Sequence, residues 1–201
     1  RGISTGAESP LYAKAIVFEQ GDERAALVLC DLIRITRELS SIVRSRASKE
    51  TGIPYQNISI TATHIHTGPR YMEQMQEYAD RMAAGKLTDE DKTSYLTGII
   101  DGITNAIITA NNQVKEVEYV SGIGQAYGIS FNRRFIMTDG SVRFNPGVQN
   151  PNIVMPAGPI DPNVHFILFK QPGGEKYDAS LTVFANHTDT YGGSNYHSDY
   201  P

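Results

Sequence analysis

The sequence predicts a mixed α/β (α+β) fold, in which one mixed sheet or two sheets are layered against flanking helices. In the first half, two long segments carry apolar residues at helical spacing. In the second half, short apolar runs rich in β-branched and aromatic residues alternate with turn residues, which is typical of strands. Apolar strands next to amphipathic helices favour a layered arrangement, because each element must bury its apolar face against another.

The composition is that of a globular protein. The chain has 201 residues, of which 40% are hydrophobic and 20% charged, so we expect a single domain over residues 1–201. A net charge of -4 offers no general attraction for phosphate backbones, and nucleic acid is therefore not an expected partner. No apolar run reaches the length of a transmembrane segment. The single cysteine, Cys30, lies in an apolar run and is expected to be a buried side chain rather than a nucleophile.

The first elements are a hairpin and a helix. Residues 12–29 predict two strands joined by a turn, with Asp31 at the end of the second strand. Thr36 can cap a helix that continues to about Glu50, where Gly52 ends it. Apolar residues on one face of this helix predict that it packs on the sheet.

A second long helix is predicted over residues 91–110, where isoleucines recur at helical spacing. Residues 70–90 are too many for a plain turn, and their Met and Tyr residues recur every three or four positions. This pattern indicates a short helix that packs its Met residues into the core, or alternatively a flap that covers a substrate.

The remaining elements are expected to be strands. A favourable hairpin turn is present at Thr138-Asp-Gly140, and residues 145–159, with four prolines, predict an irregular loop. The expected strands, the last two of them buried on both faces, are residues 114–120, 128–137, 141–144, 164–170 and 179–185.

Two histidines follow the β-branched segment that ends at Thr63. In an extended backbone, residues two apart point to the same side, so His64 and His66 are expected to face one object. Imidazole is a good zinc ligand, and a catalytic zinc site takes about three protein ligands, so this pair supplies part of a site. The alternative is that one or both histidines cap the strand and bond a carbonyl group.

A second strand end carries similar chemistry. The segment over residues 179–185 is followed by His187, then by polar residues that include Asp189, and then by two glycines. Ends of strands are where sheet proteins build sites, so His187 is the expected partner of His64. Asp189 could orient an imidazole or serve as a ligand itself. A structural role for His187 is the alternative.

These segments resemble a known family. Thr63-His-Ile-His-Thr-Gly-Pro69 is similar to the Thr-His-Thr-His-Ser-Gly-Pro signature of the neutral/alkaline, non-lysosomal ceramidases. Several similar segments in the same order are stronger evidence of a family relationship than any single motif. The other segments similar to the family, in the same order along the chain, are residues 11–18, residues 25–31, Phe131-Asn-Arg133 and Val183-Phe-Ala-Asn-His187.

The resemblance implies that this chain is the N-terminal part of a larger catalytic domain of a zinc-dependent amidohydrolase. Its substrate would be a small N-acylated molecule, such as a lipid, cleaved at the amide bond. By resemblance, His64 and His187 are zinc ligands, whereas His66 and Arg133 lie at the reacting amide, with His66 near the developing oxyanion. Zinc polarises a carbonyl and activates water. A fixed guanidinium and imidazole stabilise negative charge.

The resemblance also places functional groups outside this chain. In the family, a Glu and a Tyr complete the zinc site and a Ser is the proposed nucleophile, all further along the sequence. Asp189 and His197 are the residues that could add a ligand or brace the site here. We therefore expect the chain alone to bind zinc weakly or not at all and to be inactive. An extracytoplasmic location is implied by the resemblance only.

Departures from the family pattern leave the substrate open. The segment that follows Gly68-Pro-Arg70, residues 132–135 and Thr188 differ from the corresponding family segments, and substrate choice depends on loops that differ in this way. A carbohydrate- or peptide-binding module could instead use Tyr191, Tyr196 and Tyr200 as stacking platforms. A catalytically silent scaffold of the same fold is a further alternative.

Overall fold

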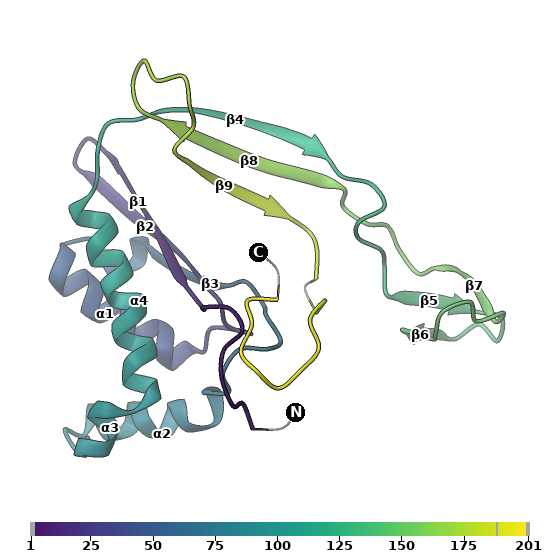
Figure 1. The fold of residues 1–201 in the computed structure, drawn as a ribbon, viewed down its shortest axis with the longest axis horizontal. Helices are drawn as coiled ribbons and strands as arrows, with labels where there is room; N and C mark the ends of the chain where they lie inside the picture. The colour runs from purple at the N-terminus through teal and green to yellow at the C-terminus, as the bar shows by residue number, and fades with distance from the viewer. Residues whose placement is uncertain (1–2, 188, 200–201) are drawn as a thin grey trace. The chain divides into compact units, whose positions relative to one another are not determined.

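The computed structural model describes residues 3–187 and 189–199, which divide into two units. The first unit comprises residues up to Lys115 together with the segment after His187, and the second comprises Glu116–His187. Within the described part of the chain, every helix belongs to the first unit (Figure 1). The predicted mixture of helices and sheets is confirmed. None of the described helices is both long enough and apolar enough to span a membrane.

The first unit is built on a three-stranded sheet. Strand β1 (Ala13–Gln20) pairs antiparallel with β2 (Glu23–Cys30), which confirms the predicted hairpin and places Asp31 directly after a strand. Strand β3 (Ile58–Ala62) pairs parallel with β2, so the sheet order is β1-β2-β3. Because β2 and β3 are parallel, the carboxyl ends of both strands meet at one edge of the sheet.

Helix α1 (Arg37–Thr51) forms the crossover between these parallel strands, followed by the short 3₁₀ helix η1 (Tyr55–Asn57). Its predicted caps are confirmed. The Thr36 side chain accepts a hydrogen bond from the Leu39 main-chain N–H, and Gly52 ends the helix in the left-handed conformation with φ 77°.

Three further helices follow: α2 (Met72–Ala83), α3 (Asp89–Thr93) and α4 (Tyr95–Asn112). The prediction of one helix over residues 91–110 is wrong at its start. Ser94 has extended dihedral angles, φ −71° and ψ 160°, and its side chain accepts a hydrogen bond from Thr97 N–H to cap α4. A hydroxyl that caps a new helix competes with continuation of the previous one, so the segment divides at this residue.

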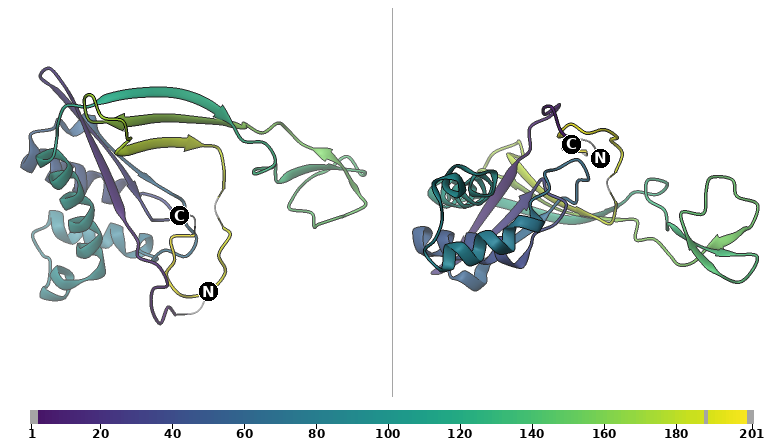
Figure 2. Two further views of the ribbon diagram at one scale, coloured as in Figure 1. Left: turned by 45° about the horizontal axis from the view of Figure 1, so that its top comes forward. Right: turned by 90° about the horizontal axis from the view of Figure 1, so that it is seen from below.

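The helices cover the sheet and bury a single core in the first unit (Figure 2). Met75 and Tyr78 of α2 are almost completely buried, which favours the core interpretation of this helix over a flap. On β2, alternate residues point into the core, as expected for a strand covered by helices on one face. The buried residues of the core are Ala26, Val28, Cys30, Leu32, Leu39, Ile42, Val43, Ala47, Ile53, Ile58, Tyr71, Met75, Tyr78, Leu96, Ile100, Ile103 and Ile107.

Residues near the two chain ends run side by side in the first unit. Ala7 and Tyr196 form a β-bridge, and the Glu8 N–H donates to the Tyr196 carbonyl at 2.8 Å. The Ser198 N–H donates to the Ser9 hydroxyl at 2.8 Å. The segment after His187 is therefore anchored on the first unit, although it follows the last strand of the second.

The second unit contains two antiparallel sheets. Strands β4 (Glu118–Gln125), β8 (Asn163–Lys170) and β9 (Ala179–Phe184) form a sheet of order β4-β8-β9. Strands β5 (Arg134–Met137), β6 (Val142–Phe144) and β7 (Ile153–Pro156) form a smaller sheet of order β6-β5-β7.

Several strand boundaries in the second unit differ from the predicted ones. Strand β4 begins later than residue 114 and continues through Gly122, which pairs with Phe166 of β8. A Cβ at Gly122 would lie 2.6 Å from Phe166 Cζ, so a glycine is needed there. Residues 128–133 are not a strand. Residues 145–159 are not all irregular, since β7 ends at Pro156 on a sheet edge, where a missing N–H is tolerated. Strands β8 and β9 are half-buried or exposed, not buried on both faces.

Candidate metal centre

The Asp31 carboxylate joins the chain just before β1 to the residue that follows β3 and precedes His64. Asp31 Oδ2 accepts the Tyr12 N–H at 2.9 Å, and Asp31 Oδ1 accepts the Thr63 hydroxyl at 3.1 Å. The Thr63 N–H donates to the Cys30 carbonyl at 2.9 Å, one residue beyond the end of β3. These bonds fix the chain immediately before His64.

His64 adopts a left-handed backbone conformation, with φ 66°. Its N–H donates to the Leu32 carbonyl at 3.0 Å, and its Nδ1 lies 2.7 Å from the Ile33 carbonyl oxygen. In the tautomer with the proton on Nδ1, this ring donates to the carbonyl and presents Nε2 as the unprotonated nitrogen. A hydrogen bond from the nitrogen that does not bind the metal to a carbonyl oxygen is the arrangement that orients metal-ligating histidines.

His66 lies beside His64, but not because the two residues alternate along a strand, as the sequence had predicted. The chain leaves the extended conformation at His64, so the two histidines are not alternate residues of one strand. Ile65 between them is fully buried, and the two rings still meet edge to face with centroids 5.1 Å apart and an interplanar angle of 89°. The predicted convergence of this pair is confirmed, although its cause is a turn.

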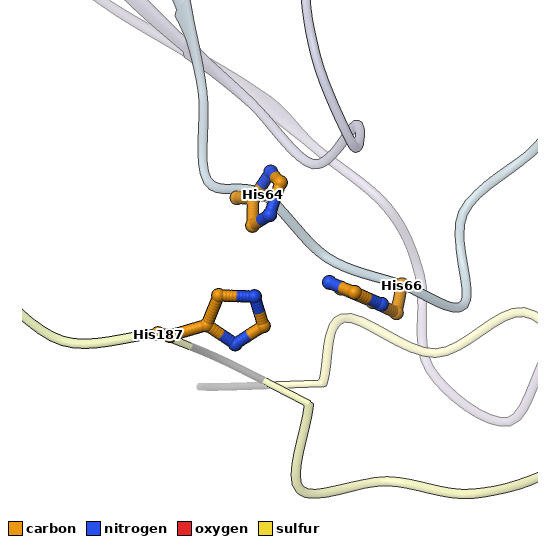
Figure 3. Close-up of side chains that lie close together, drawn as sticks. All are labelled: His64, His66 and His187. Atoms are coloured by element: carbon orange, nitrogen blue, oxygen red, sulfur yellow. The ribbon is translucent and has the colours of Figure 1, made fainter. Parts of the chain in front are cut away.

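Three histidines, His64, His66 and His187, form a group that could hold a metal ion, each offering one ring nitrogen (Figure 3). His187 lies three residues after the end of β9. Neither Asp189 nor His197 belongs to this group among the residues that the structure describes. His66, predicted to lie at the reacting amide, is thus also a candidate ligand.

Asp189 lies beside His66. Its Oδ1 is 3.7 Å from His66 Nδ1, which is beyond hydrogen-bond distance, and its side chain is about half exposed. Its φ of 132° is unusual for a residue with a side chain. The carboxylate is therefore a charged neighbour of the imidazole, consistent with a bracing role more than with a ligand of the group.

His197 is engaged in the loop rather than presented to a metal ion. Its Nδ1 accepts the Asp199 N–H at 2.8 Å, and its ring stacks on Tyr191 with centroids 4.1 Å apart and planes 9° apart. The Tyr191 hydroxyl donates to the Glu8 carboxylate. One face of Tyr191 is thus covered from within the protein, which disfavours it as a stacking platform; Tyr200 and Thr188 lie outside the described residues.

Arg133 precedes β5 in the second unit. Its guanidinium carbon lies 4.9 Å from the centroid of the Phe144 ring, and its carbonyl accepts the Asn145 N–H at 2.8 Å. Within the described part of the chain, its observed contacts join it to its own hairpin. Its role at a reacting amide stays a prediction.

Sequence reasoning missed two polar residues that are buried next to the histidine pair. Thr67 and Asp199 are each 4% exposed. The Thr67 hydroxyl donates to the His197 carbonyl at 2.8 Å, and Asp199 accepts hydrogen bonds from Thr190 and Tyr191. The only available signal was their proximity in sequence to His66 and His197, which does not distinguish them from surface residues.

A pocket of about 390 Å³ lies in the first unit beside Asp31. Gly98 and Gly102 of α4 line it, and a Cβ added at either glycine would meet no other atom within 4 Å. Its other lining residues are mostly apolar. The volume is within the range of roughly 300–1,000 Å³ found for small-molecule sites.

The fold and the histidine group together define a mixed α/β protein with a candidate metal centre at strand ends. No family model matches the chain. The chain is similar to the neutral ceramidase of Mycobacterium tuberculosis, with 26% identity over 190 residues that cover 92% of this chain and 28% of that protein. The predicted resemblance to neutral ceramidases is therefore confirmed.

Two solved structures have a similar fold. A crystal structure of neutral ceramidase from Pseudomonas aeruginosa matches with a TM-score of 0.66 and 19% identity, covering 96% of this chain and 29% of that one. A structure described as ceramidase complexed with C2 matches with a TM-score of 0.67 and 20% identity, covering 98% of this chain and 29% of that one. The chain thus spans less than a third of the length of these relatives, and it shares the fold of that part.

Proposed function

We propose that this chain is the part of a ceramidase-like, metal-dependent amidohydrolase that contributes the histidines of the metal centre. The observation that carries the proposal is the group of three histidines in a chain whose similarity to a neutral ceramidase extends over 92% of its length. The reaction would be hydrolysis of the amide bond of a small N-acylated substrate, including lipids. An extracytoplasmic location is part of the same proposal.

The donor set fits zinc. Imidazole nitrogen is a common zinc ligand, and a catalytic zinc has three protein ligands and an open position. His64 and His187 are the proposed ligands, with His66 either as a third ligand or as a group beside the reacting amide. When bound, zinc polarises a carbonyl oxygen and lowers the pKa of bound water.

Residues of this chain would orient the metal ligands and stabilise the charge that develops in the reaction. The Ile33 carbonyl holds the His64 ring through Nδ1 and so directs its other nitrogen outward. Arg133 is proposed to stabilise the negative charge that develops on the amide oxygen. The remaining metal ligands and the nucleophile are proposed to lie in other parts of a longer protein.

Metal titration tests the proposal directly. Zinc affinity of the longer protein that contains this chain is measured by competition with a chromogenic chelator, for the wild type and for His64→Ala and His187→Ala. The matched control is His165→Ala, an exposed histidine of β8 outside the group. We expect each ligand variant to lose at least about tenfold in affinity, by analogy with the loss when a ligand's supporting group is removed, and the control to bind as the wild type does.

The outcome also separates the alternatives. Zinc affinity that is equal in the wild type and in both ligand variants would refute the metal centre and favour a binding module. Zinc binding that depends on these histidines, together with no hydrolysis of an N-acylated fluorescent substrate by the longer protein, would favour a silent scaffold. Turnover that is lost with His187→Ala would support the hydrolase.

A further inference from the structure

Asp199 is a buried carboxylate with several donors around it. It is 4% exposed and has φ 62°, a conformation that is unusual for a residue other than glycine. Its Oδ1 accepts the main-chain N–H groups of Thr190 at 2.7 Å and Tyr191 at 2.9 Å, and the Thr190 hydroxyl at 3.0 Å. A buried charge is tolerated when it is hydrogen-bonded in this way.

The same carboxylate reaches the histidine pair. The main-chain N–H of His66 also lies close to Asp199 and is one of the groups that lower its pKa. Burial by itself raises the pKa of Asp199, but the hydrogen bonds from Tyr191, Thr190 and His66 outweigh it and lower the pKa below its ordinary value. Asp199 thus accepts hydrogen bonds from residues 190 and 191 and lies beside the main chain of His66.

A second contact joins the same two segments one residue further on. The Thr67 hydroxyl donates to the His197 carbonyl at 2.8 Å, and the His197 N–H donates back to the Thr67 carbonyl at 3.4 Å. Thr67 and Ile65 are buried, whereas the His66 side chain between them retains 27% of its exposure. The backbone on both sides of His66 is thus held in place while its ring remains accessible.

The clamped loop also carries Asp189. Asp189 immediately precedes Thr190, whose N–H and hydroxyl are both bonded to Asp199. The Asp189 carboxylate lies 3.7 Å from His66 Nδ1. Asp199 therefore lies against the backbone of His66 and is bonded to Thr190, the residue that follows Asp189.

We propose that Asp199 is the positioning residue of His66: it joins the main chain of His66 to residues 190 and 191, and so holds the His66 ring and the Asp189 carboxylate in a constant relation. Asp199 does not belong to the group that could hold a metal ion among the described residues, so it acts through His66. The consequence for metal binding rests on the proposed function, because His66 matters there only as a member of the metal centre.

Two variants separate positioning from general anchoring of the loop. Asp199→Ala removes the acceptor, whereas Asp199→Asn keeps an acceptor oxygen of the same shape without the charge. The matched control is Asp139→Ala, because Asp139 also accepts a main-chain N–H, from Ser141 at 2.9 Å, but in the turn between β5 and β6. All three variants are made in the full 201-residue chain.

The first measurement needs no metal. In ¹H–¹⁵N spectra of the metal-free chain, loss of a charged acceptor moves the His66 amide proton upfield, together with those of Thr190 and Tyr191. We expect this shift to be large in Asp199→Ala, smaller in Asp199→Asn and absent in Asp139→Ala. A His66 amide that stays unchanged in both Asp199 variants, while the residue 190 and 191 amides move, overturns the proposal and makes Asp199 a loop anchor.

The second measurement is zinc affinity by chelator competition. Loss of a group that orients a ligand typically weakens metal binding about 10–100-fold, and we expect a loss of that size in Asp199→Ala with partial rescue in Asp199→Asn. Full wild-type affinity in Asp199→Ala overturns the proposed consequence for the metal centre. If the wild-type chain binds no zinc, the affinities are compared in the longer protein that contains it; if that protein also binds no zinc, the proposed function fails, and the His66 amide alone decides the positioning role. If Asp199→Ala does not fold, Asp199→Asn provides both measurements.

Discussion

Tyr71→Phe should destabilise the first unit through a loop that also holds His64. Tyr71 is fully buried just before α2, and its hydroxyl donates to the Arg34 carbonyl at 2.6 Å and accepts the Thr36 N–H at 3.2 Å. These two groups belong to the loop between β2 and α1. The same loop supplies the Leu32 and Ile33 carbonyls that bond the His64 N–H and ring.

The expected loss of stability follows from the Arg34 carbonyl and the Thr36 N–H, which lose their hydrogen-bond partner. Phenylalanine keeps the ring, so no cavity forms and the packing of α2 is retained. The substitution removes the partner of one carbonyl and one N–H, and leaving such partly buried groups unsatisfied costs about 1–3 kcal/mol. A loss of that size changes the unfolding equilibrium constant by roughly 5–150-fold.

Urea unfolding followed by circular dichroism at 222 nm measures this loss, because all the described helices belong to the first unit. The control is Tyr55→Phe. The Tyr55 ring lies under Arg44, whose guanidinium carbon is 3.9 Å from its centroid, and its hydroxyl has no hydrogen bond to any described residue. The control should change stability by less than about 0.5 kcal/mol. Equal urea midpoints for the two variants would refute the reasoning.

Three further predictions concern helix propensity, acid sensitivity and catalysis. Gly98→Ala should stabilise the protein by about 0.5–1 kcal/mol and raise its Tm, because alanine is the better helix former and its Cβ meets open space; a lower Tm would contradict this. Hydrogen bonds from Arg81 and Thr88 lower the pKa of Asp91 from 3.8 to about 2. The folded-state pKa is depressed, so this stabilisation is present above pH 4 and is lost as the pH falls from 4 to 2. Asp91→Asn should remove that part of the acid dependence of the urea midpoint, and an unchanged dependence would argue against it. In a longer, active protein, Arg133→Ala should reduce turnover about 10²-fold or more with zinc content unchanged, whereas equal loss of both would show a structural role.

The elements that the sequence predicted well depend on neighbouring residues. Thr36 and Gly52 bound α1 because a capping hydroxyl and a left-handed glycine act within one turn of the helix. The predicted boundaries are wrong where another local contact, or pairing with a distant strand, overrides the pattern of neighbouring residues. Ser94 starts a new helix within the predicted one, and β7 forms because β5 offers it a pairing edge.

The sequence by itself determined the chemistry of the candidate site: imidazoles at His64, His66 and His187, each following a β-branched segment. Only the tertiary structure decided how the first two meet, since a left-handed turn at His64 brings the rings together where an extended strand had been expected. It also showed that Asp199 is buried against His66, more than 130 positions away in sequence. Side-chain identity and short-range spacing can be read along the chain, but burial of a carboxylate depends on which distant backbone N–H groups fold around it.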